Sequence, residues 1–225
     1  MKLIPVMDLM AGQVVHARRG ERDNYRPVQS TLCPSAAPEA ILQAFIKHFS
    51  CDTVYIADLE AIRFGRPQLT LLKELKSNFP TIRFWIDAGI VDFDTFVNLH
   101  QVELGTLVIG SESLSSSNWL ETLAPESWIL SLDFMGDAFL GPPDVLVHRA
   151  IWPQKVLVMN LAHVGNESGP DYDLLRMLQR SRPESEIYAA GGVRDESDLR
   201  VLEQRGYAGA LVATALHNGN IKLKV

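Results

Sequence analysis

Eight short runs of apolar, β-favouring residues recur along the chain, and segments with helical or loop character separate them. Most runs are nearly continuous Val, Ile, Leu or Ala, which is typical of parallel strands that are covered on both faces. The alternation of strands and helices predicts a parallel α/β fold, which could be a closed barrel or an open, doubly wound sheet. The expected strands are Leu3–Asp8, Thr53–Asp58, Ile82–Asp87, Thr106–Gly110, Trp128–Asp133, Val156–Asn160, Glu186–Ala190 and Gly209–Ala213. The expected helices are Pro38–Ser50, Pro67–Asn78, Phe93–Gln101, Ser116–Leu123, Asp144–Ile151, Asp171–Arg180 and Glu196–Gly206.

An internal repeat favours the barrel over the open sheet. Pro67 and Pro170 follow the second and sixth runs and lie 103 residues apart, and the third and fourth runs match the seventh and eighth at the same shift. The first and fifth runs pair Asp8 with Asp133 at a larger shift, because extra residues follow the first run. Two similar halves of four strands close into an eight-stranded barrel more naturally than into an open sheet.

Length and composition agree with one barrel. The chain has 225 residues, of which 47% are hydrophobic, and TIM barrels usually need about 200–250 residues. We therefore predict a single domain over residues 1–225, a (β/α)₈ TIM barrel with a two-fold internal repeat. Its half-barrels should cover about 1–125 and 126–225.

Several classes of function are disfavoured by the same composition. The net charge is −6, with both signs mixed along the chain, so a nucleic-acid partner is not expected. We expect no membrane partner, because no apolar stretch reaches about 18 residues. Cys33 and Cys51 lack a metal-binding spacing, so we expect no metal, no cofactor and a cytoplasmic location. The oligomeric state is left open.

The ends of the expected strands carry most of the candidate site, because TIM-barrel enzymes place their active sites where strands end. Asp is disfavoured inside strands, yet it ends four of these eight. Asp8 and Asp133 match in the two halves, and two carboxyl groups in one pocket can divide base and acid roles. The alternative is that each Asp only caps the helix or loop that follows. The other strand-end candidates are Asp58, Asp87, Gly110, Ser111 and Asn160.

Paired glycines at the end of the seventh run predict an anion site. Gly191 and Gly192 would let backbone N–H groups approach a phosphate, and Ala213 and Thr214 end the eighth run beside them. A short helix beginning there would add its positive end. The alternative is a tight turn that needs glycine for its own conformation.

The segment Ile4–Val15, which reads Ile-Pro-Val-Met-Asp-Leu-Met-Ala-Gly-Gln-Val-Val, resembles the opening of the HisA/HisF family of histidine-biosynthesis barrels. Later blocks of that family are matched in the same order across the chain, more closely to HisA than to HisF. These blocks are Val54–Ala61, Val108–Ser111, Leu130–Asp133, Ser168–Pro170 and Ala190–Val193. The resemblance implies an isomerase that converts an aminoaldose into an aminoketose on a substrate with two phosphates. It places the base on Asp8, a supporting carboxylate on Asp133 and phosphate contacts at Gly110 and Ser111.

The chain also departs from the family pattern. Val164 stands where the resemblance places a general acid, so His163 or Glu167 would have to replace that acid. Asp87 occupies the glycine-rich turn for the other phosphate, and a carboxylate there would repel a second phosphate by roughly 1–4 kcal/mol. His16 stands where the resemblance places a substrate-binding arginine.

These observations lead to three hypotheses. The first is a HisA-like enzyme that performs acid/base isomerisation or a related proton transfer on a small phosphorylated metabolite. Its catalytic residues would be Asp8 and Asp133, with Asp58, Asp87, Asn160, His16 and His163 elsewhere in the pocket. The second, implied only by the resemblance, is an enzyme of methanopterin-type one-carbon cofactor biosynthesis. The third is a non-catalytic barrel that binds a ligand or a partner.

Overall fold

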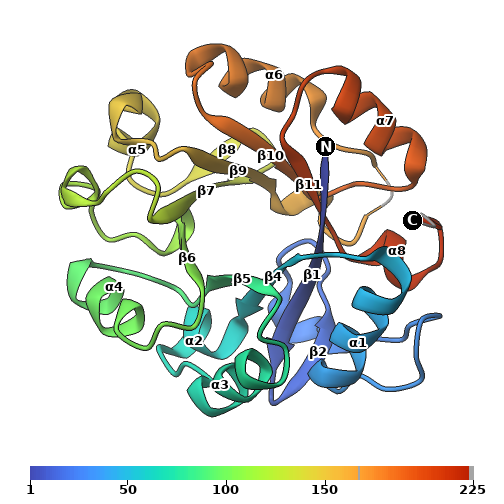
Figure 1. Ribbon diagram of the computed structural model, residues 1–225. Helices are drawn as coiled ribbons and strands as arrows, with labels where there is room; N and C mark the ends of the chain where they lie inside the picture. The colour runs from blue at the N-terminus through green and yellow to red at the C-terminus, as the bar shows by residue number, and fades with distance from the viewer. Residues whose placement is uncertain (167, 223–225) are drawn as a thin grey trace.

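The computed structural model describes residues 1–166 and 168–222, and its centre is a closed ring of parallel strands (Figure 1). In ring order the strands are β1 (Lys2–Met10), β4 (Thr53–Asp58), β5 (Arg83–Asp87), β6 (Thr106–Gly110), β7 (Trp128–Met135), β9 (Lys155–Asn160), β10 (Glu186–Ala190) and β11 (Gly209–Val212). Strand β11 also pairs with β1, which closes the ring. The predicted (β/α)₈ barrel is confirmed, whereas the repeat of half-barrels and the single-domain division stay predictions.

Helices surround the ring on its outer side, as Figure 1 shows. The longer ones are α1 (Pro38–Phe49), α3 (Leu69–Asn78), α4 (Phe93–His100), α6 (Tyr172–Ser181) and α7 (Glu196–Gln204). Three are short: α2 (Leu59–Phe64), α5 (Asp144–Val147) and α8 (Thr214–His217). In the described part of the chain, we find no helix with the length and apolar character that crossing a membrane requires.

Two of the expected helices are wrong in whole or in part. The segment 116–123 holds only a 3-10 turn, η3 (Leu120–Thr122), between β6 and β7. Serines crowd the start of this segment, and their hydroxyls compete with helical hydrogen bonds for the backbone. The expected helix Asp144–Ile151 is divided at His148, whose non-helical backbone separates α5 from the 3-10 turn η4 (Arg149–Ile151).

Each strand of the ring contributes a buried side chain to the interior of the barrel. These are Ile4, Tyr55, Trp85, Val108, Ile129, Leu157, Tyr188 and Leu211. A second, larger apolar cluster lies between the outer faces of the strands and the helices. Side chains alternate between the two faces of a strand, so every second residue points inward. The residue that ends each strand therefore faces the mouth or the helices according to its phase.

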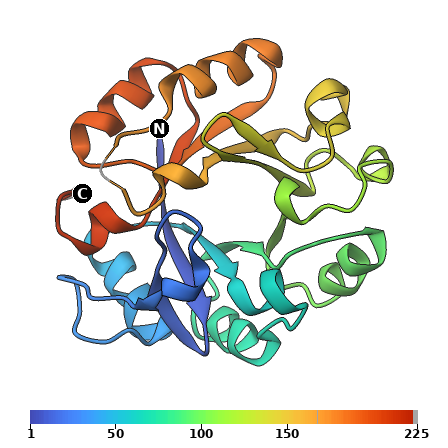
Figure 2. The ribbon, with the colours of Figure 1, turned by 180° about the vertical axis from the view of Figure 1, so that it is seen from behind.

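A long connection after β1 folds back over the mouth of the barrel. Strand β2 (Gln13–His16) pairs antiparallel with β1, and the short β3 (Arg26–Pro27) pairs with β2. Between them lies the 3-10 turn η1 (Arg22–Asn24). Figure 2, seen from behind, shows this blue hairpin in front of the ring. We call residues 17–28 the mouth loop.

Gly165 allows the mouth loop to pack on the connection after β9. Its φ is +66°, and a Cβ added there would lie 2.2 Å from the carbonyl oxygen of Ala17. Gly65 has a similar φ of +63° but no heavy atom within 4 Å of the added Cβ. The two glycines therefore share a positive φ but differ in what surrounds them.

We expect Gly165→Ala to lower the free energy of unfolding by about 2–4 kcal/mol, through backbone strain and the clash together. Gly65→Ala should cost only the strain, about 1–2 kcal/mol. Urea unfolding of both variants measures the difference. Equal losses would contradict the close approach of the mouth loop to Gly165.

Candidate active site

A cavity opens at the end of the barrel where the strands terminate, and it brings together most of the predicted site residues. From the first half of the chain it is lined by Asp8, His16 and Asp87. From the second half it is lined by Asp133, Gly191, Gly192, Ala213 and Thr214. The cavity also includes side chains from the mouth loop, which covers part of the opening.

The phase of each strand explains why three aspartates face this cavity. Asp8 lies four residues after the inward-facing Ile4, and Asp133 lies four residues after Ile129. Asp87 follows the inward-facing Trp85 by two residues, so it also points inward. Strands β1 and β7 are four positions apart in the ring of eight, so Asp8 and Asp133 face each other across the mouth.

Asp133 is the most deeply held of the three, with 4% of its surface exposed. The Ser131 hydroxyl donates to its Oδ1 at 2.6 Å, and the Glu112 backbone N–H donates to its Oδ2 at 3.1 Å. Burial and, next, the nearby Glu112 carboxylate raise the pKa of Asp133 to about 8, while the hydrogen bonds from Ser131 and the Glu112 N–H act in the opposite direction. Asp133 is therefore mainly protonated at neutral pH and can donate a proton.

Asp87 lies between the other two carboxyl groups and is 8% exposed. It accepts hydrogen bonds from the Tyr55 hydroxyl at 3.1 Å and from the Gly89 backbone N–H at 3.1 Å. Burial raises its pKa to about 6, which leaves it mainly ionised at neutral pH. A Cβ on Gly110 would lie 3.2 Å from Oδ2 of Asp133 and 3.4 Å from Oδ2 of Asp87. Gly110 thus makes room for two carboxyl groups, where the family resemblance implies a phosphate.

Asp8 lines the cavity beside the mouth loop. Burial raises its pKa to about 7, with the Arg22 guanidinium acting in the opposite direction and the Asp87 carboxylate in the same direction. Asp8 therefore titrates near neutral pH, and its ionised form can accept a proton. The pKa values of Asp8 and Asp133 differ in the direction that suits a base and an acid.

The side of the cavity next to β11 carries neutral and basic groups. The His16 Nε2 lies 3.0 Å from the Thr214 hydroxyl, so these two predicted residues contact each other. His217 also lines the cavity, and its Nδ1 lies 2.9 Å from the Ser30 hydroxyl. Burial lowers the pKa of His16, and burial with the nearby His16 lowers that of His217 to about 4. The nearest carboxyl group in ring order is Asp8 on β1, which pairs with β11, whereas Asp87 and Asp133 come from β5 and β7.

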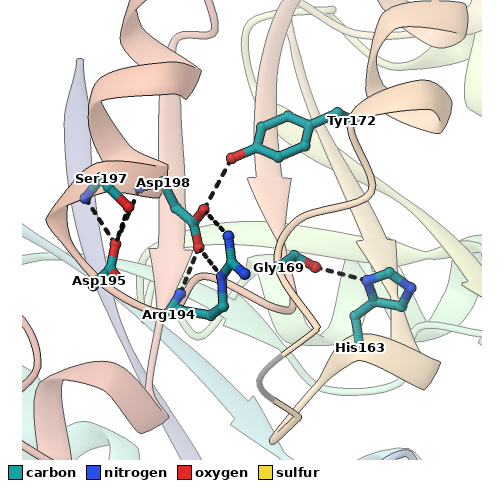
Figure 3. Close-up of polar contacts among 7 residues, drawn as sticks. All are labelled: His163, Gly169, Tyr172, Arg194, Asp195, Ser197 and Asp198. Carbon is teal, nitrogen blue, oxygen red and sulfur yellow. Dashed lines mark hydrogen bonds and ion pairs between the residues drawn. The ribbon is translucent and has the colours of Figure 1, made fainter.

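The glycine turn after β10 is fixed from behind by a buried carboxylate. Figure 3 shows Asp198, at the start of α7, accepting from the Arg194 backbone N–H at 2.9 Å and from its guanidinium at 2.9 and 2.8 Å. The Tyr172 hydroxyl, on α6, donates to the same carboxylate at 3.1 Å. Gly192 has a φ of +83°, and a Cβ there would lie 2.1 Å from the Gly169 carbonyl oxygen. Gly192 therefore has the conformation that the tight-turn alternative requires. The predicted anion site at its backbone N–H stays a prediction.

Five predicted residues do not line the cavity: Gly110, described above, and Asp58, Asn160, Ser111 and His163. Asp58 and Asn160 follow the inward-facing Ala57 and Met159, so they point to the other face of their strands. Asp58 is fully buried, caps α2 through the Ala61 N–H and accepts from Gln68.

The other three also hold local structure. Asn160 accepts from the Ala162 and Gly136 N–H groups. The Ser111 hydroxyl accepts the Asp133 backbone N–H at 2.9 Å. The ring of His163 donates to the Gly169 carbonyl oxygen at 2.8 Å, as Figure 3 shows. Glu167 lies outside the described residues.

Sequence reasoning missed several polar groups of the cavity, namely Arg22, Tyr25, Tyr55, Glu112 and His217. Tyr55 is two residues before Ala57 and shares its phase, so strand phase could have found it. The others lie in loops or in α8, where no periodic pattern points to the mouth. Within the described residues, no three His, Cys, Asp or Glu side chains form a group that could hold a metal ion.

Comparisons with known proteins find similar sequences across nearly the whole chain. The model of the family described as histidine biosynthesis protein matches residues 2–222. An uncharacterized protein of Methanocaldococcus jannaschii is 26% identical, over 100% of this chain and 96% of its own length. Proteins named 1-(5-phosphoribosyl)-5-((5-phosphoribosylamino)methylideneamino)imidazole-4-carboxamide isomerase are similarly related. The one from Lacticaseibacillus casei is 25% identical, over 99% of this chain and 97% of its own length. The one from Pyrococcus furiosus is 23% identical, over 99% of this chain and 92% of its own length.

The raised pKa of Asp133 predicts a dependence of stability on pH. Between the ordinary pKa of an aspartate and about 8, the folded protein keeps a proton that the unfolded chain has lost. The contribution of Asp133 to stability is therefore present at low pH and is lost as the pH rises through about 8.

Asp133→Asn removes this dependence because the amide stays neutral. Relative to the wild type, we expect this variant to gain at least about 1.4 kcal/mol of unfolding free energy between about pH 5 and about pH 9. Urea unfolding at the two pH values measures the gain. A constant difference between the proteins would show that Asp133 is ionised in the folded state throughout.

Proposed function

The chain belongs to the family of histidine biosynthesis proteins, and on this premise we propose that it is an acid/base isomerase of a small, phosphorylated, sugar-like metabolite. The curated relatives that carry an activity in their names are isomerases of a phosphoribosyl compound. The general reaction class, isomerisation, is proposed from the names of these relatives. The division of roles in this chain rests on the geometry of its own cavity.

The observation that carries the proposal is the placement of four groups around the ring. Asp8 on β1 faces Asp133 on β7, while Asp87 on β5 faces the turn after β10. A substrate that extends from the Gly192 turn toward Asp87 would therefore have a carboxyl group on each side. Reactions that move a proton from carbon to carbon or oxygen need this arrangement of base and acid.

Each group has a role that suits its environment. The ionised form of Asp8 would remove a proton from the carbon next to a carbonyl or imine. Protonated Asp133 would donate to the oxygen or nitrogen on which negative charge develops. The phosphate would lie at Gly191, Gly192 and Thr214, across the ring from Asp87, where backbone N–H groups and a hydroxyl are the expected donors.

The substrate should differ from that of the named isomerases. Val164 lines the cavity at the position where the resemblance implies an acid, and valine cannot transfer a proton. Ionised Asp87 lies where the resemblance implies a second phosphate, so a polar or cationic group suits that end better. We therefore propose a substrate with one phosphate at the Gly192 end.

Asp8→Asn and Asp133→Asn should each lower turnover by about 10²–10⁴-fold, because each removes one partner in proton transfer. Incorporation of solvent deuterium into aldose phosphates and aminoaldose phosphates, followed by proton NMR, measures this reaction. Asp94→Asn, which changes an exposed aspartate at the start of α4, is the control and should retain full turnover. Unchanged turnover in Asp8→Asn would remove the enzyme hypothesis and favour a barrel that only binds.

Thr214→Val should weaken the binding of inorganic phosphate about tenfold, because it removes one hydrogen bond to a charged group. Thr70→Val, on the exposed face of α3, is the matched control. Calorimetric titration gives both the affinity and the number of phosphates bound. Two phosphates bound by the wild type would contradict the single-phosphate proposal. A second phosphate that binds only in Asp87→Asn would agree with it, because the variant removes the repelling carboxylate.

A further inference from the structure

The mouth loop is attached to the barrel on opposite sides of the cavity. On one side, the Arg19 backbone N–H donates to the Val164 carbonyl oxygen at 2.9 Å, in the connection after β9. On the other, Asp23 forms an ion pair with Arg63 of α2, which follows β4. Because β9 and β4 lie far apart in the ring, the loop must cross the opening between these attachments.

Arg22 extends from this loop into the cavity and forms an ion pair with Glu112. The two side chains are 25% and 23% exposed, so the pair is partly shielded from water. Glu112 belongs to the 3-10 turn η2 (Ser111–Ser113), and its backbone N–H donates to Oδ2 of Asp133. Glu112 is thus held next to Asp133, whereas Arg22 belongs to the mouth loop, which follows Asp8 in the chain.

We propose that Arg22, held across the mouth by Glu112, is a positioning residue that assigns the base role to Asp8 and the acid role to Asp133. This inference rests on the proposed function of the same cavity. The two carboxyl groups have matching positions on opposite strands, and strand phase alone gives them the same orientation. The ion pair is an asymmetric feature between them, because it places a positive group near one and a negative group near the other.

The charges around each carboxyl group agree with this assignment. Arg22 favours the ionised form of Asp8, against the effect of Asp87. Tyr55 of β4 and Tyr25 of the mouth loop also interact with Asp8, but both remain neutral because their own pKa values are raised.

Asp133 meets only groups that favour its protonated form or are neutral. Glu112 and Asp87 raise its pKa, and Tyr55 is neutral. The Ser131 hydroxyl and the Glu112 N–H offset part of this effect. Arg22 is not among the main influences on the pKa of Asp133.

The test is a carboxyl ¹³C NMR titration of the protein without ligand, with Asp8→Asn and Asp133→Asn used to assign the two signals. Arg22→Gln should raise the titration midpoint of Asp8 by about one pH unit, because it removes an opposite charge. Arg22→Lys keeps the charge and should restore most of the difference. Glu112→Gln should lower the midpoint of Asp133.

Asp23→Asn is the matched control, because it breaks the other ion pair of the same loop without changing a cavity charge. It should leave the midpoint of Asp8 where it is. An unmoved Asp8 in Arg22→Gln, or an equal movement in Asp23→Asn, would overturn the proposal. If Arg22→Gln does not fold, Glu112→Gln decides, since an unmoved Asp133 contradicts the role of the ion pair.

A second readout separates this inference from the proposed function. The acidic limb of the pH profile of turnover should move upward in Arg22→Gln by the same amount as the NMR midpoint. Absence of turnover in the wild type would count against the proposed function alone, because the NMR titration needs no substrate. A moved midpoint with an unmoved acidic limb would show that Asp8 is not the base and would overturn the assignment of roles.

Discussion

The alternation of side chains along strands that close into a ring is the constraint on which this structure depends. Closure leaves each strand one inward and one outward face, and the inward faces converge at the mouth. Ile4, Trp85 and Ile129 fill the interior, so Asp8, Asp87 and Asp133, which share their phase, meet in one cavity. The outward phase sends the equally acidic Asp58 to cap a helix instead.

Burial of three carboxyl groups around one cavity costs stability, and the structure offsets this cost unevenly. Asp133 accepts hydrogen bonds from Ser131 and Glu112, and Asp87 accepts them from Tyr55 and Gly89. Asp8 is instead influenced by a charge from the mouth loop. Since each carboxyl group is offset in a different way, the three differ in pKa although all are aspartates. Such differences allow groups of one type to take different chemical roles.

The two ends of the cavity have also become chemically different. The end near β5 holds Asp87, and Gly110 provides room for its carboxylate beside that of Asp133. The end near β10 and β11 holds a glycine turn that Asp198 supports through Arg194, with Thr214 and His16 in contact beside it. A ligand that carries one anionic and one polar or cationic end would complement this division, which is why we favour a substrate with one phosphate.

The sequence by itself determined the parallel α/β class and its eight strands, because continuous apolar runs of this length, alternating with helices, are typical of parallel strands that are buried on both faces. It favoured the closed barrel over an open sheet only through the internal repeat. It also indicated Asp8, Asp87 and Asp133, since a carboxylate at the end of an apolar run is visible in the printed residues. It could not separate these from Asp58 or Asn160 without the phase of each strand. It also predicted a helix at 116–123 that the structure lacks, because the apolar pattern was read without the competition of serine hydroxyls for the backbone.

Only the tertiary structure decided which residues far apart in the chain meet at the mouth. Arg22 and Glu112 are 90 residues apart and lie in irregular segments, where no periodicity fixes the direction of a side chain. Their pairing depends on how the mouth loop crosses the opening, which is set by packing against Gly165 and by the ion pair of Asp23 with Arg63. Local sequence patterns specify strands and their faces, whereas the electrostatic surroundings of a buried group depend on all the elements that converge on it.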